Sequence, residues 1–146
     1  MSLYNKPVNK FVAGFIGTPP MNFFEGVLER RGEVCVFRKE GMELELPAEW
    51  TAALAPHVGE KVTLGVRPED IGSTQAAATP GMPRVTATVD VIEPMGSETY
   101  VHATVGGDPF VARVEPTRQL HPGMTASLPI HMPRAHVFDA GGSAVV

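Results

Sequence analysis

Histidine, cysteine and charged side chains are the residues of this chain that could carry catalysis or hold a metal, and their spacing favours neither. The sequence contains no Gly-x-x-x-x-Gly-Lys-Ser/Thr run, the pattern that cradles nucleotide phosphates, and no Gly-x-Ser-x-Gly nucleophile elbow. The five histidines lack the His-x-x-x-His spacing of a metal site: His57, His102, His121, His131 and His136. Cys35 stands between two valines, so we expect it to be buried in a strand rather than reactive. We therefore expect no catalytic residue, no metal and no cofactor in this chain.

The charged run Arg67-Pro68-Glu69-Asp70 is the best candidate for a specific polar contact. It follows an alternating apolar segment, so Arg67 is expected at the rim of a small barrel, where a strand ends. A guanidinium held there can form an ion pair inside the domain, or it can reach a carboxylate across a subunit boundary. The sequence leaves both alternatives open.

Composition bounds the class of protein. The chain has 146 residues, of which 43% are hydrophobic, enough for the core of one domain or of two small ones. A formal charge of −4 argues against a protein that binds nucleic acid through its phosphates, since that requires clustered Lys and Arg. The single cysteine is consistent with a reducing cytoplasm. No signal-peptide pattern opens the chain, and no apolar run approaches the ~18 residues that a membrane span requires.

Alternation of apolar and polar residues predicts that most of the chain is β structure. We expect strands over 24–29, 34–38, 42–46, 62–66, 85–91, 100–105, 110–114, 124–130 and 135–138, and a helical turn over 48–54. In the strand over 85–91, the side chains of Val85, Ala87, Val89 and Val91 are expected to share one face. Gly and Pro at the intervening positions supply tight turns.

Residues 72–82 contain three Ala, two Gly, two Thr, one Ser and one Pro without periodicity, which is typical of a linker. They divide the predicted strands into two small β lobes, at about 21–71 and 83–146. Short strands at this spacing are typical of a sandwich or of the five-stranded oligonucleotide/oligosaccharide-binding (OB) barrel. The predicted fold class is therefore all-β, with OB-fold-like barrels.

A short amphipathic helix is expected within residues 1–20. Its apolar residues recur at i, i+3, i+4, i+7 and i+8, as Val8, Phe11, Val12, Phe15 and Ile16. Pro19 and Pro20 forbid its continuation. The apolar stripe needs a partner surface, which is either the chain's own β domain or a domain absent from this chain.

Three motifs in order along the chain resemble the ATP-binding subunits of bacterial importers of the maltose and glycerol-phosphate type. Residues 11–17 and 21–23 read Phe-Val-Ala-Gly-Phe-Ile-Gly and Met-Asn-Phe, as in the segment that joins that family's nucleotide-binding domain to its C-terminal regulatory domain. Residues 64–69 resemble the family's Leu-Gly-Ile-Arg-Pro-Glu, and residues 91–99 resemble its Val-Val-Glu-x-Leu-Gly-x-Glu-Thr.

The resemblance implies a regulatory domain of the transport-associated OB (TOBE) type at 21–146, with residues 1–20 as the tail of a missing nucleotide-binding domain. It implies that ATP and Mg²⁺ bind in the missing domain and that this chain is not itself an enzyme. The implied parent is a cytoplasmic ATPase subunit, peripheral to the inner membrane, of a transporter that imports sugars or glycerol phosphate. We expect the chain to be an excised piece of that subunit rather than a natural fragment.

The partners implied by the resemblance are a second copy in a homodimer and the nucleotide-binding domain of the same subunit. The membrane subunits would be contacted indirectly, and a cytoplasmic regulator is a further possible partner. The candidate inter-domain or regulator contacts are Lys10, Phe23, Arg67, Glu69, Glu93, Gly96 and Glu98.

Two other classes of function match parts of the sequence less well. Molybdate-binding (MOP-like) domains have a related barrel and begin Ser-Ala-Arg-Asn-x-x-x-Gly-x-Val; Asn22 and Gly26 match that start, but the Ser-Ala-Arg is missing. A small-oxyanion binding module is therefore the alternative. A binder of single-stranded nucleic acid needs a positive groove with stacking aromatic residues, which the acidic balance disfavours.

Overall fold

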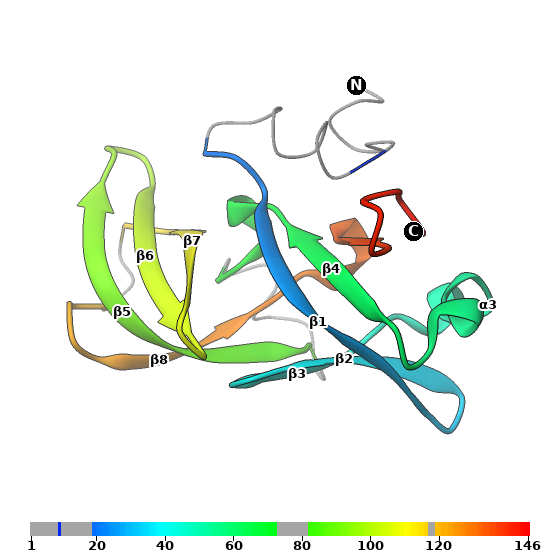
Figure 1. The fold of residues 1–146 in the computed structure, drawn as a ribbon. Coiled ribbons are helices and arrows are strands. Elements are labelled where there is room, and N and C mark those ends of the chain that lie inside the picture. The colour runs from blue at the N-terminus through cyan, green and yellow to red at the C-terminus, as the bar shows by residue number, and fades with distance from the viewer. Residues whose placement is uncertain (1–8, 10–18, 73–81, 117–118) are drawn as a thin grey trace.

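The computed structural model describes residues 9, 19–72, 82–116 and 119–146, and these form two antiparallel sheets (Figure 1). The five-stranded sheet has the order β3-β2-β1-β4-β9 and consists of β1 (Asn22–Arg31), β2 (Val34–Lys39), β3 (Met42–Glu45), β4 (Lys61–Val66) and β9 (His136–Phe138). The four-stranded sheet has the order β7-β6-β5-β8 and consists of β5 (Arg84–Pro94), β6 (Thr99–Val105), β7 (Asp108–Val114) and β8 (Thr125–Pro129). The predicted all-β, OB-fold-like class is confirmed.

Short helical turns connect the strands. They are η1 (Ala48–Trp50), α3 (Thr51–Leu54), η2 (Ala55–His57), η3 (Pro68–Asp70) and η4 (Met132–Arg134). The first two match the helical turn predicted over 48–54, and Leu54 anchors them by its burial in the core. In the described part of the chain, no helix is long and apolar enough to cross a membrane.

Two predicted segments fall largely outside the described residues. Of residues 1–20, where a helix was predicted, the structure describes 9, 19 and 20, so the helix itself lies outside the described residues. Of the predicted linker over 72–82, it describes the two ends, Gly72 and Met82. Asn9 forms an isolated bridge with Ser143, which places it beside the C-terminal tail.

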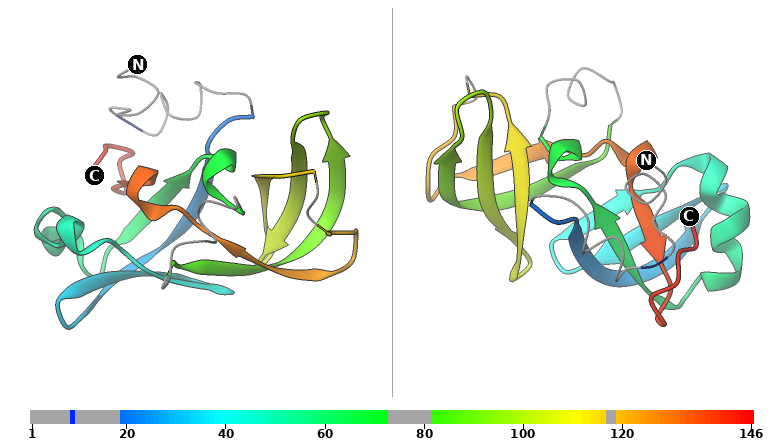
Figure 2. Two further views of the ribbon diagram at one scale, coloured as in Figure 1. Left: turned by 180° about the vertical axis from the view of Figure 1, so that it is seen from behind. Right: turned by 90° about the horizontal axis from the view of Figure 1, so that it is seen from above.

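The last of the described strands, β9, belongs to the same five-stranded sheet as the first, β1. After β8 the chain crosses between the sheets (Figure 2), and β9 pairs antiparallel with β4, with Val137 opposite Leu64. An isolated bridge between Ile71 and Ile130 joins the segment after β4 to the segment after β8. The chain thus runs from the five-stranded sheet to the four-stranded sheet and back.

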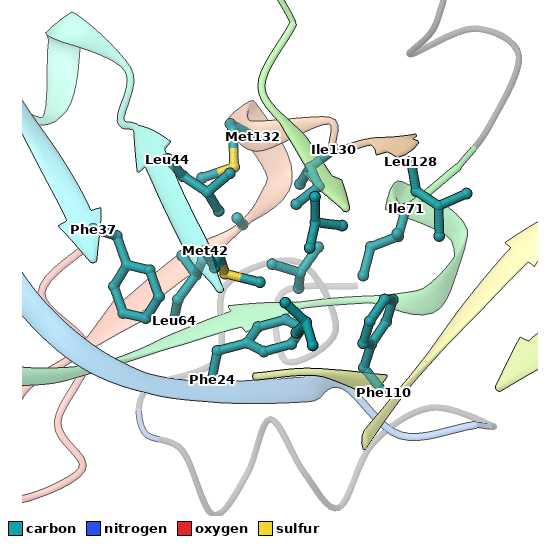
Figure 3. Close-up of a cluster of buried hydrophobic side chains, with 14 of the residues drawn as sticks. Phe24, Phe37, Met42, Leu44, Leu64, Ile71, Phe110, Leu128, Ile130 and Met132 are labelled. Carbon is teal, nitrogen blue, oxygen red and sulfur yellow. The ribbon is translucent and has the colours of Figure 1, made fainter. Parts of the chain in front are cut away.

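One hydrophobic core lies between the sheets. Phe24 of β1 and Phe110 of β7 meet edge to face with their ring centroids 5.6 Å apart (Figure 3). Ile71, Leu128 and further aliphatic side chains from both sheets belong to the same buried cluster. Cys35 lies buried in β2, as expected. Because the inner faces of both sheets share this core, either sheet alone would expose a large apolar surface.

The register of β5 departs from the predicted alternation. Val89 pairs with Ala103 and Val91 pairs with the next residue of β6, His102, so β5 carries a bulge at Asp90. A bulge inserts one unpaired residue, and every side chain beyond it changes face. Val89 is buried as predicted, but Val91 is 53% exposed, and the prediction that it shares the face of Val89 was wrong.

Candidate docking surface

The outer face of β5, β6 and β7 exposes apolar side chains next to paired charges. Across these strands Val91 lies opposite His102, which lies opposite Val111, and in the next row Glu93 lies opposite Tyr100. Val91 is 53% exposed and Met95, in the turn after β5, is 51% exposed. An antiparallel sheet that faces water on one side normally presents polar residues there. We call this face, with Val91 and Met95 as its most exposed apolar residues, the docking surface.

The bulge that turns Val91 outward is held by a side-chain hydrogen bond. The hydroxyl of Thr104 on β6 donates to Oδ2 of Asp90 at 2.6 Å. The unpaired residue of the bulge is thereby tied to the neighbouring strand. The exposure of Val91 is therefore built into the strand rather than left to a loose loop.

Three of the predicted contact residues lie together at the end of the docking surface. Glu93 is 3.1 Å from Nε2 of His102, and Glu98 forms an ion pair with Nε of Arg113 at 3.1 Å. Gly96 takes a positive φ of 91° in the turn between β5 and β6, a conformation that favours glycine. Each acid lies near a basic group of the same sheet, so the charges flank the apolar residues without a large excess of either sign.

Arg67 and Glu69 lie in a second group, at η3, where the sheets join. Arg67 is 3% exposed, so its guanidinium is not presented at an open rim. Glu69 and Asp70 both face Arg134 of η4, at 4.0 Å and 3.6 Å. The backbone N–H of His131 donates to the carbonyl oxygen of Asp70 at 2.8 Å. This group is a junction inside the domain.

Asp70 is the electrostatically unusual member of that junction. Its carboxylate is buried, and Oδ2 has no hydrogen-bond partner among the described residues. Burial raises the pKa of Asp70 above its ordinary value, and the positive charge of Arg134 opposes part of that increase. Sequence reasoning included Asp70 in the charged run but did not find Arg134, 64 residues further on.

Phe23 belongs to neither group, and Lys10 lies outside the described residues. Phe23 is on the outer face of the five-stranded sheet, where its ring meets that of Phe138 edge to face at 6.1 Å. Met21 and Phe138 form a small buried cluster with it, separate from the main core. A Cβ on Gly65 would lie 2.5 Å from the sulfur of Met21, so a larger residue there would force the side chains of this cluster to shift.

Two polar side chains that tie the sheets together were not recognised as such from the sequence. Nδ2 of Asn22 donates to the carbonyl oxygen of Val111 at 2.8 Å, and the N–H of Val111 donates to Oδ1 of Asn22 at 2.9 Å. Nζ of Lys39, almost fully buried, lies 3.1 Å from Oδ2 of Asp108 and donates to the carbonyl oxygens of Glu40 and Val105. A polar residue in a buried strand position was the available signal for Asn22, but its partner lies 89 residues away.

The described residues offer little to a small ligand. They contain no cluster of three or more His, Cys, Asp or Glu side chains that could hold a metal ion. One groove of about 340 Å³ crosses the outer face of β1 and β4, where Glu25 and Lys61 both line it. A lining with one acid and one base is not selective for an anion.

Comparison with known proteins agrees with the fold. A family model described as the MalK OB fold domain matches residues 17–71, and one described as the TOBE domain matches residues 64–138. The chain is 37% identical over 140 residues to the trehalose/maltose import ATP-binding protein MalK of Thermococcus litoralis, covering 94% of this chain. It is 38% identical to the multiple sugar-binding transport ATP-binding protein MsmK of Streptococcus mutans, covering 99% of this chain.

A third relative is the sn-glycerol-3-phosphate import ATP-binding protein UgpC of Salmonella paratyphi A, 37% identical over 95% of this chain. The chain spans 36% to 38% of the length of these three relatives. Among solved structures, the molybdate-bound form of the cytoplasmic molybdate-binding protein ModG is similar with a TM-score of 0.59. It is 20% identical, over 80% of this chain and 94% of that one, which is a likeness of fold.

The two family models overlap at 64–71, the stretch from β4 to the junction between the sheets, and together they reach from residue 17 to residue 138. The TOBE model alone covers more than half of the chain. Its range contains the bulged β5, the docking surface and the returning strand β9. The chain therefore belongs to the TOBE domain family.

Proposed function

We propose that this chain is a regulatory and dimerisation domain of the ATP-binding subunit of an ABC transporter that imports sugars or glycerol phosphate. The relatives named above support the transporter class, because each is named as an import or transport ATP-binding protein. The observation that carries the dimerisation role is the docking surface, where Val91 and Met95 are each more than half exposed. Exposed apolar residues with paired charges beside them are typical of a protein interface.

The mechanism follows from symmetry and linkage. A homodimer with two-fold symmetry uses the same patch on both copies, so the patch must be self-complementary. The docking surface carries acids and bases side by side, as Glu93 with His102 and Glu98 with Arg113, which permits such pairing. Two copies paired here would hold two ATPase domains together while these open and close. A cytoplasmic regulator that binds one state better than the other would shift the transport cycle.

ATP hydrolysis is assigned to a nucleotide-binding domain outside this chain. That domain would bind ATP and Mg²⁺, and it would contact the membrane subunits, placing the assembly on the cytoplasmic side of the membrane. Within this chain, no residue is proposed to act on nucleotide, since the sequence lacks the phosphate-cradling run.

The dimer is tested by light scattering over a concentration series of the purified chain. We expect the wild-type chain to dimerise and the double variant Val91→Glu with Met95→Glu to be monomeric, because two charges would be buried without partners. Val58→Glu is the matched control: Val58 is 37% exposed, lies after η2 and is not part of the docking surface. This control is expected to remain dimeric.

Three results would contradict the dimerisation role as proposed. The first is a wild-type chain that stays monomeric throughout the series. The second is a dimer that survives the double substitution, which would place the contact elsewhere. The third is a dimer that is lost in Phe15→Asp but kept in the double variant, which would assign the contact to the predicted apolar stripe of residues 8–16.

Oxyanion binding, the alternative function, has less support. The similarity to ModG concerns the fold. A second groove, beside the turn between β2 and β3, is lined by Arg38 and Lys39, and both cations already have partners. Nζ of Lys39 has Glu40, Val105 and Asp108 as its three acceptors, and Arg38 is paired with Glu29 at 2.7 Å. A calorimetric titration with molybdate should give no saturable heat, and saturable binding would revive this alternative.

A further inference from the structure

The side chain of Asn22 leaves its own sheet and pairs with the backbone of the other. Asn22 begins β1, and its backbone lies opposite Val66 of β4 in the five-stranded sheet. Its carboxamide both donates to the carbonyl oxygen of Val111 and accepts from the N–H of Val111, at 2.8 and 2.9 Å. A carboxamide that makes both bonds to one residue reproduces what a neighbouring strand would offer there.

The strand that Asn22 binds belongs to the docking surface. β7 is an edge of the four-stranded sheet, and Val111 continues the row that runs through His102 to Val91. Pro109, two residues before Val111, has no N–H to offer at this edge. Asn22 therefore binds the residue of the edge strand, Val111, at which the cross-strand row to His102 and Val91 begins.

Two other contacts hold β7, but neither fixes its position along the strand axis as the hydrogen bonds of Asn22 do. Lys39 binds Asp108 and the carbonyl oxygen of Val105, which fixes the turn where β7 begins. Phe24 packs edge to face on Phe110. This contact holds β7 close to β1, but it only weakly opposes a shift of β7 along its own axis. The paired hydrogen bonds of Asn22 are directional, so they fix where β7 lies relative to the start of β1.

We infer that Asn22 is a positioning residue that couples the start of β1 to the docking surface. A displacement of the chain at the start of β1 is passed through the carboxamide to Val111, and from there across β6 to Val91. By linkage, occupation of the docking surface acts back on the start of β1 with the same coupling free energy. The last step rests on the proposed function, since it takes the docking surface to be where two copies pair.

The coupling is tested by hydrogen exchange and amide chemical shifts, measured by NMR on the full 146-residue chain. In Asn22→Ala the Val111 amide loses its acceptor, so its exchange should accelerate by about tenfold or more beyond what any change in global stability explains. The amide resonances of Val91, two strands away, should shift. Asn22→Asp is a second, isosteric variant that keeps an acceptor for the Val111 N–H but sets a carboxylate oxygen against the Val111 carbonyl, so its Val111 amide should exchange at an intermediate rate.

Phe24→Leu is the matched control. It removes ring contacts from the same strand and lowers global stability, but it leaves the carboxamide in place. Relative to global stability, its Val111 amide should keep the wild-type protection. Unchanged Val111 exchange in Asn22→Ala, or an equal loss in Phe24→Leu, would overturn the inference, as would Val91 resonances that do not move.

The dimer measurement separates this inference from the proposed function. If the wild-type chain dimerises, Asn22→Ala should raise the dissociation constant several-fold more than Phe24→Leu does, and equal effects would overturn the coupling. If the wild-type chain is monomeric but the Val111 and Val91 signals change as expected, the positioning role is supported and dimerisation through this surface is what fails.

Discussion

The outer faces of the two sheets differ in how far they expose apolar side chains. On the five-stranded sheet, Glu29 of β1 binds both Arg31 and Arg38, and Arg31 also binds Glu43 of β3. On the same outer face, Val36 lies opposite Glu29 of β1 and Glu45 of β3, and it remains only 4% exposed. On the four-stranded sheet the corresponding face leaves Val91 and Met95 more than half exposed.

This difference distinguishes a closed face from an open one. Long charged side chains can lie over apolar surface with their stems while their heads remain in water. The Arg and Glu side chains beside Val36 are placed to form such a cover. The ion pairs of the docking surface, Glu93 with His102 and Glu98 with Arg113, leave Val91 and Met95 exposed. The same antiparallel pattern thus gives a face with its apolar residue shielded from water in one sheet, and a candidate interface in the other.

The largest expected effect comes from forcing the two sheets apart at their touching turns. A Cβ on Gly106 would lie 2.0 Å from the carbonyl oxygen of Glu40, and the residue has a φ of +53°. Gly106→Ala should therefore lower the free energy of unfolding by about 2–4 kcal/mol, measured by urea denaturation. Gly107→Ala is the control: its φ is also positive, but a Cβ would meet nothing within 4 Å, so a loss of about 1 kcal/mol is expected. Equal losses would show that the two turns are not in contact.

Lys39→Met should have the next largest effect. It keeps most of the apolar stem but leaves the carbonyl oxygens of Glu40 and Val105 without this donor, at a cost of about 1–3 kcal/mol in the free energy of unfolding. Arg38→Met, on the outer face of the five-stranded sheet, should cost less than about 1 kcal/mol. A larger effect for Arg38 than for Lys39 would reverse our view of which contact joins the sheets.

Asp70→Asn tests the junction through its pH dependence. Burial raises the folded-state pKa of Asp70 above its ordinary value of 3.8, so the folded chain binds this proton more tightly than the unfolded chain. The stability that Asp70 contributes is therefore full below that ordinary value and is lost as the pH rises through the folded pKa. Relative to wild type, the free energy of unfolding of Asp70→Asn should increase from pH 3 to pH 7, as followed by thermal denaturation at each pH. A difference that does not change with pH would contradict the assignment.

The smallest effect is expected on the closed face itself. Glu29→Gln removes the partner shared by Arg31 and Arg38, and exposed ion pairs of this kind contribute less than about 1 kcal/mol. The loss in the free energy of unfolding should shrink further in about 1 M salt, where such charges are screened. If Glu29→Gln also caused the chain to self-associate, these ion pairs would be shown to act mainly as a cover over Val36.

Local pattern was sufficient to predict most of the described strands. The alternation around Leu44 and Leu64, the glycine turns, and the helical turn near Trp50 all depend on neighbours close in sequence, and the structure has elements at each of these places. The family was also predictable, because its motifs are short runs such as those at 64–69 and 91–99. The burial of Arg67 was not predictable, because it depends on segments far along the chain. The exposure of Val91 was not predictable either, because alternation alone does not reveal the bulge at Asp90.

The sequence by itself determined the all-β class, the approximate strands and the family, since side-chain periodicity and turn residues act over a few positions. Tertiary structure decided the rest. β9 returns to β4, Arg134 reaches Asp70, and Asn22 binds Val111 across 89 positions. These features rest on pairings between distant segments, whose geometry exists only after both sheets have closed on their common core.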